Sequence, residues 1–307
     1  MYLQHFRLAQ APFALTPNLS MYCHLSQHEE AMQVLKYGLS QGECLMKVVG
    51  EVGLGKTLLC RQMLNTLGDE YVTCYIFNPC LSGDDILKAV SQDLGLPVPE
   101  DATRFTLIEA LSAELLKQHE AHRRVVLLVD EAHLLNDEAM EVMRLLTNLE
   151  TDSSKLLQII LVGQPELDAR LATPQLRQIQ QRIAYSCYLH ALDPEHTQSY
   201  LMRRLLAAGH CHGQVFTKAA VKALNRYAKG VPRIINILCN KAMLIACSRG
   251  DQMVSLQDMK KAIKDSVSLI DTTTHYGATS KHYGLLTAVS LVTFGVVAGL
   301  MYLLFQR

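Results

Sequence analysis

Short runs of apolar residues alternate, over the first two thirds of the chain, with segments in which apolar residues recur every three or four positions. A continuous apolar run bounded by turn residues is typical of a strand buried on both faces, and the recurrent spacing is typical of an amphipathic helix. The alternation predicts an α/β fold, in which helices cover both faces of a parallel sheet. The five predicted strands lie near residues 44–49, 71–77, 125–129, 156–162 and 185–189.

Beyond Asp193 the pattern becomes wholly helical. Asp193 is a favourable N-cap residue, and Pro194 follows it at the first helical position, where its missing N–H costs nothing. We therefore expect a small all-helical domain after the sheet. Its predicted helices lie at residues 193–208, 217–228, 232–248 and 255–267.

The last part of the chain has the composition of a membrane span, because no charged residue occurs from position 283 to position 305. As a helix rising ~1.5 Å per residue, residues 284–305 are long enough to cross a hydrocarbon core of ~30 Å. Tyr283, Tyr302 and Phe305 lie near its ends, where aromatic rings favour the membrane interface. We predict a C-terminal transmembrane helix, preceded by a polar linker and followed by a short tail.

A glycine-rich loop follows the first predicted strand and precedes a predicted helix. It reads G-x-x-x-x-G-K-T, the pattern of a phosphate-binding loop. Glycines let backbone N–H groups turn inward toward phosphate oxygens, and the N-terminus of the following helix favours the same anion. We expect ATP and Mg²⁺, with Lys56 reaching the β and γ phosphates and the Thr57 hydroxyl ligating the metal. The predicted nucleotide-binding residues of the loop are Gly50, Glu51, Val52, Gly53, Leu54, Gly55, Lys56 and Thr57.

Two acidic residues, Asp130 and Glu131, directly follow a continuous apolar run. In open α/β sheets, ligands bind at the carboxyl ends of the strands, so Asp130 is expected beside the Mg²⁺ that Thr57 holds. Glu131 is expected to orient or deprotonate the attacking water. The triphosphate is expected where this strand and the loop's strand end side by side. Gln164 ends another strand and is predicted to contact the γ-phosphate or the water.

These segments divide the chain into parts with different expected roles. The predicted parts are an N-terminal lead-in strap and helix (1–42), a nucleotide-binding domain (43–190), a helical lid domain (191–267), a linker (268–283), a transmembrane helix (284–305) and a tail (306–307). The proline-punctuated lead-in leaves two interpretations open, packing near an adenine ring or strapping the surface of the core.

Composition narrows the choice of partners. The chain has 29 Lys plus Arg and 29 Asp plus Glu, so its formal net charge is zero. As a whole it lacks the net positive charge that is typical of nucleic-acid-binding proteins. Nine cysteines stand without C-x-x-C spacing. They indicate reduced thiols in a reducing compartment rather than a disulfide framework.

With these motifs in place, the chain resembles AAA+ ATPases of the ExeA/GspA general secretion type. The length and the predicted span are most similar to the ATPase associated with biogenesis of the mannose-sensitive haemagglutinin (MSHA) type IV pilus. The segments that carry the resemblance are residues 6–17, 50–57, 130–133, 144–150, 163–167 and 230–236.

The resemblance implies a P-loop AAA+ core and roles for residues that the patterns above do not single out. Arg233 is similar to the sensor arginine that contacts the γ-phosphate from the helical domain. Arg182 is similar to the arginine finger that one subunit offers to the next, and Arg177 is the alternative for that role. Such a finger can be worth ~10³–10⁵ in rate. The resemblance therefore also implies an ATP-dependent, ring-forming homo-oligomer.

The expected function is ATP hydrolysis that supports assembly or localisation of a type IV pilus or a type II secretion apparatus. The expected location is the inner membrane, with a single span and the ATPase domain in the cytoplasm. Only Gln306 and Arg307 follow the predicted span, so we expect a partner to supply any grip on the cell wall. Two alternatives stay open, a DNA-linked helper ATPase of the transposition type and a scaffold that senses ATP without hydrolysing it.

Overall fold

The computed structural model describes residues 2–16, 18–77, 82–152, 154–212 and 214–266. Within these ranges, none of the helices combines the length and the apolar composition needed to cross a bilayer. The predicted linker, the predicted span over residues 284–305 and the predicted tail all lie outside the described residues.

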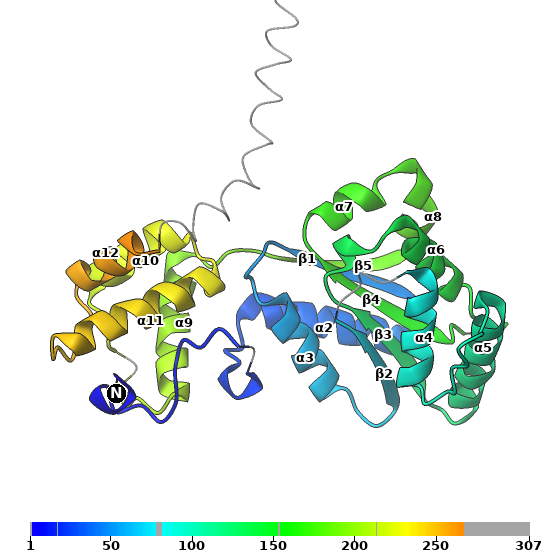
Figure 1. Cartoon of the computed structure of the whole chain (residues 1–307), viewed down its shortest axis with the longest axis horizontal. Helices are drawn as coiled ribbons and strands as arrows, with labels where there is room; N and C mark the ends of the chain where they lie inside the picture. Colours follow the sequence, from blue (N-terminus) through cyan, green and yellow to red (C-terminus); the bar gives the residue numbers. More distant parts are fainter. Residues whose placement is uncertain (1, 17, 78–81, 153, 213, 267–307) are drawn as a thin grey trace, which may run out of the picture.

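A parallel sheet forms the centre of the larger part of the molecule (Figure 1). Its strand order is β2-β3-β4-β1-β5, and every neighbouring pair is parallel. The prediction of an α/β core with a parallel five-stranded sheet is therefore confirmed. The strands are β1 (Leu45–Gly50), β2 (Tyr71–Ile76), β3 (Arg124–Val129), β4 (Leu157–Gly163) and β5 (Ile183–Leu189).

Helices cover both faces of the sheet because its strands carry apolar side chains on both. Along β3, Val125 and Leu127 belong to the core on one face, whereas Val126 and Leu128 belong to the core on the other. This is the alternation expected of successive residues in a strand. One face packs against α2 (Ser26–Gln41) and α3 (Lys56–Thr66), and the other against α4 (Gly83–Asp93), α5 (Arg104–Glu120), α6 (Asp137–Leu146), α7 (Glu166–Leu171) and α8 (Arg177–Gln180).

The helical region, residues 191–266, has a core of its own beside the sheet (Figure 1). Its long central helix α11 has the bounds expected from the sequence, because Pro232 fixes its first turn. The helices are α9 (Pro194–Ala207), α10 (Lys218–Ala228), α11 (Pro232–Ser248) and α12 (Leu256–Lys264).

The N-terminal lead-in packs into the core of the helical region. Phe6 and Phe13 are 2% and 1% exposed and lie among the side chains of that core. The buried Arg204 of α9 donates hydrogen bonds to the carbonyl oxygens of Pro12, Ala14 and Met21 and so ties the segment down. The lead-in is thus part of a core rather than a strap over the surface. It includes the short helix α1 (Tyr2–His5) and a 3₁₀ turn, Leu19–Met21.

Two details differ from the sequence-based expectation. Helix α7 is not among the elements expected from the sequence, because it is only six residues long and shows no periodic pattern. Strand β4 lies between β1 and β3, so the loop strand and the acidic strand do not end side by side. The carboxyl end of β4, with Gln164, is placed between them.

Candidate nucleotide-binding site

The phosphate-binding loop connects the carboxyl end of β1 to the first residue of α3. Gly53 and Gly55 adopt positive φ values of 83° and 90°, a left-handed conformation that glycine adopts without steric cost. Gly55 is the N-cap of α3, which begins at Lys56. The loop therefore directs the free N–H groups of a helix N-terminus toward a binding pocket, as an anion requires.

Lys56 is buried, with 5% of its surface exposed, and its ammonium is held by the loop itself. Its Nζ donates hydrogen bonds to the carbonyl oxygens of Gly50 at 2.8 Å and Glu51 at 3.0 Å. Burial lowers the pKa of Lys56, and the nearby charges of Glu131 and Asp130 oppose that shift. The lysine and the acid pair thus lie close enough to interact electrostatically.

Asp130 follows β3 and is 2% exposed. Its carboxylate accepts hydrogen bonds from the Tyr75 hydroxyl at 3.3 Å and from the Glu131 N–H at 2.9 Å. In the described part of the chain, the Thr57 hydroxyl on α3 makes no hydrogen bond. A buried carboxylate and a free hydroxyl at one edge of the sheet are ligands that suit a hard divalent cation.

Glu131 has a left-handed backbone, with φ 51° and ψ 36°. Such a conformation is uncommon for a residue other than glycine and is found most often where a site requires it. Gln164 Nε2 lies 3.4 Å from Glu131 Oε2 and 2.8 Å from His133 Nε2. His133 Nδ1 lies 3.5 Å from the same carboxylate oxygen of Glu131. The structure therefore brings Gln164 to Glu131, as its place at a strand end suggested, and adds His133, which the sequence analysis did not single out.

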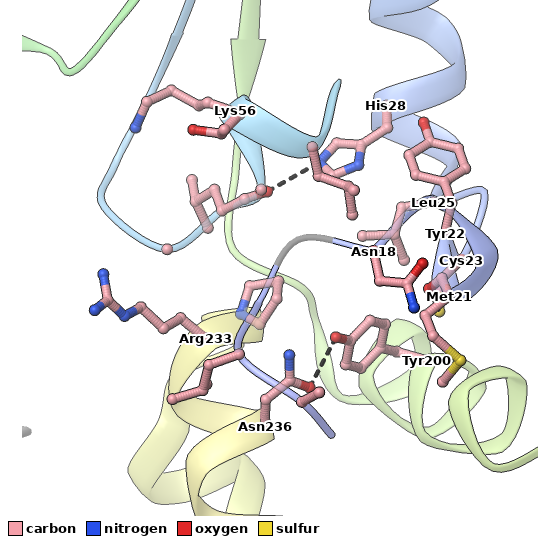
Figure 2. Close-up of a pocket in the computed structure, with 18 of the residues that line it drawn as sticks. Asn18, Met21, Tyr22, Cys23, Leu25, His28, Lys56, Tyr200, Arg233 and Asn236 are labelled. Atoms are coloured by element: carbon pink, nitrogen blue, oxygen red, sulfur yellow. Dashed lines mark hydrogen bonds between the residues drawn. The ribbon is translucent and has the colours of Figure 1, made fainter. Parts of the chain in front are cut away.

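Arg233 brings the helical region to the loop. Its backbone N–H donates to the Gly53 carbonyl at 3.2 Å, and its side chain is exposed. The Arg233 guanidinium forms no ion pair or hydrogen bond with any residue that the structure describes. Figure 2 shows Arg233 and Lys56 extending to the same side of the pocket, from α11 and α3.

A cavity of about 380 Å³ lies between the loop, the lead-in and the helical region. Lys56, Thr57, Glu131 and Arg233 line it, together with apolar and polar residues of the lead-in (Figure 2). Opposite the charged side chains, the hydroxyl of Tyr200 donates to Asn236 Oδ1 at 2.8 Å. The end of the cavity at the phosphate loop is thus charged, and the opposite end combines apolar side chains with Arg204 beside the Tyr200 ring. The lead-in residues that line it are Ala14, Leu15, Thr16, Asn18, Met21, Tyr22, Cys23 and Leu25.

His28 supports the loop through a hydrogen bond and was not recognised from the sequence. It is 3% exposed, and its Nε2 donates to the Leu54 carbonyl at 2.9 Å. A methyl group on Gly55 would meet the His28 ring at 2.9 Å, so this position requires glycine for space as well as for conformation. Nothing in the spacing of His28 distinguishes it from a surface histidine of the same helix.

The two candidate finger arginines lie away from this pocket. Arg182 directly precedes β5, so it lies at the amino end of the sheet, a strand length of about 20 Å from the edge that carries the loop. Its Nη1 donates to the Thr147 hydroxyl, whereas Arg177 is exposed and unpaired within the described residues. Neither arginine lines the cavity of its own chain.

The residues present fit a magnesium–nucleotide complex. Lys56 is a buried cation held only by carbonyl oxygens, which leaves its charge available to a phosphate. Thr57 and Asp130 would hold the metal, and residues 50–57 would hold the phosphates.

Residues 40–171 match the family model of the AAA domain. The strand order, the phosphate loop and this match agree on a P-loop AAA core.

The chain is also 41% identical, over 263 residues, to General secretion pathway protein A of Aeromonas hydrophila. The match covers 85% of this chain and 48% of that protein, so the chain spans about half the length of its curated relative.

Solved structures with the same fold share little sequence with the chain. Cdc6p from Pyrobaculum aerophilum has a TM-score of 0.64 at 17% identity, covering 83% of this chain and 70% of its own. A Walker-type ATPase of Pyrococcus abyssi has a TM-score of 0.59 at 15% identity, covering 88% and 80%. At these identities the likeness shows the fold alone.

Proposed function

We propose that the chain hydrolyses ATP in the cavity between the phosphate loop and the helical region. The observation that carries the proposal is the convergence of Lys56, Glu131, Gln164 and Arg233 from four separate segments on one place. Three of these segments belong to the sheet domain and one belongs to the helical region. A site that only held ATP would not need a carboxylate positioned by two neighbouring side chains.

Each residue has a distinct task in this proposal. Lys56 from α3 and Arg233 from α11 neutralise phosphate charge, and Glu131 accepts a proton from the attacking water or orients it. Gln164 fixes the Glu131 carboxylate, which otherwise could rotate. Mg²⁺, when bound by Thr57 and Asp130, supplies neutralisation of the β- and γ-phosphate oxygens.

Phosphate release by the purified full chain tests this function. Replacing the general base in Glu131→Gln should lower turnover about 10²–10⁴-fold while nucleotide binding is retained. Lys56→Ala should instead weaken nucleotide affinity by roughly 10²-fold or more, because it removes a charge that pairs with the phosphates. Glu141→Gln, an exposed carboxylate outside the pocket, is the matched control. Normal turnover by Glu131→Gln would show that the base is misassigned, and tight binding without any phosphate release would favour the ATP-sensing scaffold.

We further propose that a neighbouring subunit completes each site with an arginine. This follows from the position of Arg182 and Arg177 at the end of the sheet away from their own cavity. Mixing two inactive variants tests it, since Glu131→Gln supplies intact arginines and an arginine variant supplies an intact base. The finger is the arginine whose alanine variant is inactive alone and regains turnover when it is mixed with Glu131→Gln. A mixture that stays as inactive as its components would contradict a shared site.

The cellular role that we propose is support of a type II secretion apparatus or an MSHA-like type IV pilus at the inner membrane. The likeness to General secretion pathway protein A supports the secretion class. In this proposal residues 284–305 anchor the chain and the ATPase core faces the cytoplasm. Crosslinking in native membranes, with ATP and without it, should trap envelope assembly proteins. Recovery of only cytoplasmic partners would contradict the role.

A further inference from the structure

The chain is neutral as a whole, but its two regions have opposite charges. Residues 191–266 contain twelve Lys and Arg against five Asp and Glu, a formal charge of +7. Residues 1–190 contain fifteen against twenty-three, a formal charge of −8. Charge asymmetry of this size within one chain indicates a surface that meets an anionic partner.

The basic residues of α10 form a stripe on its outer face. Lys218, Lys222 and Arg226 are spaced four residues apart, and Lys229 follows directly after the helix on the same side. All four are exposed, while the buried Ala220, Leu224 and Ala228 face the core from the opposite side. Helix α10 contains no acidic residue.

Helix α12 presents a second basic face beside the first. Lys260, Lys261 and Lys264 are exposed, and the buried residues Met259, Ala262 and Ile263 face inward. Helices α10 and α12 pack against each other and against α11, at the end of the molecule away from the sheet (Figure 1). Their outer surfaces therefore adjoin, and we call the seven residues the basic face (Lys218, Lys222, Arg226, Lys229, Lys260, Lys261 and Lys264).

The basic face is not used within the fold. None of its side chains makes an ion pair or a hydrogen bond to a residue in the described ranges. Among the described residues of this region, Asp251 and Asp258 pair with Arg249, and the Asp265 carboxylate is exposed beside the lysines. Most other cations of the helical region, such as Arg203, Arg204 and Lys241, do have partners in the fold. The charge of the basic face is thus available to a surface outside the protein.

The continuation of the chain indicates which surface that is. Helix α12 ends at Lys264, and the predicted span begins at residue 284. A connection of about 20 residues reaches at most about 70 Å, so it holds the basic face near the membrane at a raised effective concentration. The cytoplasmic leaflet carries anionic lipids, which attract basic surfaces within a Debye length of about 8 Å.

We propose that the basic face of α10 and α12 docks on anionic lipid headgroups of the membrane. The proposal rests on the proposed membrane anchor at residues 284–305. The docked state orients the helical region at the bilayer and leaves the acidic sheet domain directed away from it. Because Arg233 joins the helical region to the phosphate loop, the membrane contact would also constrain the movement of one wall of the nucleotide cavity.

Lysine footprinting of the full chain in nanodiscs tests the docking. A water-soluble amine-acetylating reagent is applied to discs of phosphatidylcholine alone and of phosphatidylcholine with phosphatidylglycerol. Acetylation of Lys222 and Lys260 should be slowed about fivefold or more in the anionic discs, and high salt should reverse the protection. Lys117, whose side chain is 74% exposed on α5, is the internal reference and should react equally in both discs.

Substitutions separate charge from fold. The fourfold variant Lys222→Gln, Arg226→Gln, Lys260→Gln, Lys264→Gln should remove the protection of Lys218 and Lys229. The charge-retaining variant Lys222→Arg, Arg226→Lys, Lys260→Arg, Lys264→Arg should keep it. Both variants should hydrolyse ATP in detergent, because none of these residues lines the cavity.

Three outcomes would overturn the docking. Equal acetylation of the basic face in neutral and anionic discs would directly contradict docking on anionic lipids. Loss of protection in both fourfold variants shows a structural rather than an electrostatic effect. Stronger protection by duplex DNA than by anionic lipid, at the same salt, identifies a nucleic-acid surface instead. Incorporation of the chain into discs is measured separately. A chain that does not incorporate contradicts the proposed anchor. Binding of that chain to added anionic vesicles then tests the basic face.

Discussion

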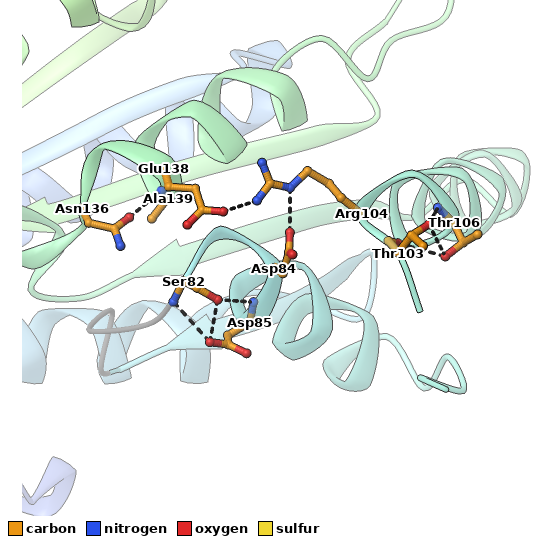
Figure 3. A network of polar contacts seen from close by, with 9 residues as sticks. All are labelled: Ser82, Asp84, Asp85, Thr103, Arg104, Thr106, Asn136, Glu138 and Ala139. Atoms are coloured by element: carbon orange, nitrogen blue, oxygen red, sulfur yellow. Dashed lines mark hydrogen bonds and ion pairs between the residues drawn. The ribbon is translucent and has the colours of Figure 1, made fainter. Parts of the chain in front are cut away.

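The sheet domain and the helical region use their cations in different ways. On the sheet domain, Arg104 and Arg170 pair with acids of neighbouring helices. Arg104 of α5, for example, bridges Asp84 of α4 and Glu138 of α6 (Figure 3). In the helical region, the seven residues of the basic face have no such partner among the described residues.

The difference separates two roles of surface charge. Paired charges on the sheet domain act locally and hold its helices in register around the sheet. Unpaired charges of one sign create a field that extends beyond the molecule and suits association rather than stability. The nucleotide cavity lies where the two regions meet, so both contribute cations to it, Lys56 from the sheet domain and Arg204 and Arg233 from the helical region.

The largest expected effect is on the start of the helical region, at the joint where the chain enters it after β5. Gly230 has φ 77°, and a methyl group there would lie 1.9 Å from the Leu192 carbonyl oxygen. Leu192 donates its N–H to the Gly230 carbonyl at 2.9 Å, so the two backbones cannot simply move apart. We expect Gly230→Ala to lower the free energy of unfolding by about 2–4 kcal/mol. Denaturant unfolding of the full chain measures this loss.

Gly250→Ala is the control for that substitution. Gly250 has φ 80° but nothing within 4 Å of an added methyl group, so it isolates the conformational cost from the steric clash. This variant should lose about 1–2 kcal/mol. Equal losses at the two positions would mean that the Leu192 contact does not define the joint.

The next effect concerns the contact between the loop and the helical region. A methyl group on Gly53 would lie 2.8 Å from Arg233 Cβ and 3.0 Å from Val231 Cγ1. Relief of that clash moves Arg233 away from the loop, so Gly53→Ala should weaken nucleotide affinity about tenfold, or 1.4 kcal/mol. Isothermal titration with a non-hydrolysable nucleotide measures it. Gly42→Ala, at a positive φ with open space, should leave affinity unchanged, and equal affinity of both variants would show that the contact is unimportant.

A third effect depends on pH. Burial lowers the pKa of His28, which as a neutral ring donates to the Leu54 carbonyl. The unfolded chain therefore binds more protons than the folded chain as the pH falls below the ordinary histidine value of ~6.5. Stability is fully present above that pH and is lost below it, by at most about 1.4 kcal/mol per pH unit for this residue.

Burial also lowers the pKa of His133, so this residue too contributes to the loss of stability at low pH. His28→Gln keeps a donor for Leu54 and should make the free energy of unfolding less steep between about pH 5 and pH 6.5. Burial likewise lowers the pKa of His210, so the contribution of His28 is the difference in slope between His28→Gln and the unaltered chain. The same slope in His28→Gln as in the unaltered chain would exclude His28 as a source.

The sequence predicted the sheet well because its strands are continuous buried runs, a signal that does not depend on distant contacts. The order of the strands could not be predicted in this way, since the position of β4 between β1 and β3 depends on how helices pack across the sheet. For the site, the loop motif and the acid pair indicated Lys56, Asp130 and Glu131, whereas His28 and His133 act through contacts that spacing does not encode. The basic face was hidden by a net charge of zero.

The smallest expected effect compares one paired and one unpaired cation directly. Arg104→Ala should cost about 0.5–1 kcal/mol of stability, because its guanidinium is partly exposed and its two ion pairs are screened by solvent. Lys222→Ala should change stability by less than about 0.5 kcal/mol, because it removes a charge without a partner. High salt should reduce the cost of Arg104→Ala. A larger loss of stability in Lys222→Ala than in Arg104→Ala would mean that the basic face contributes to the fold of the helical region rather than to association.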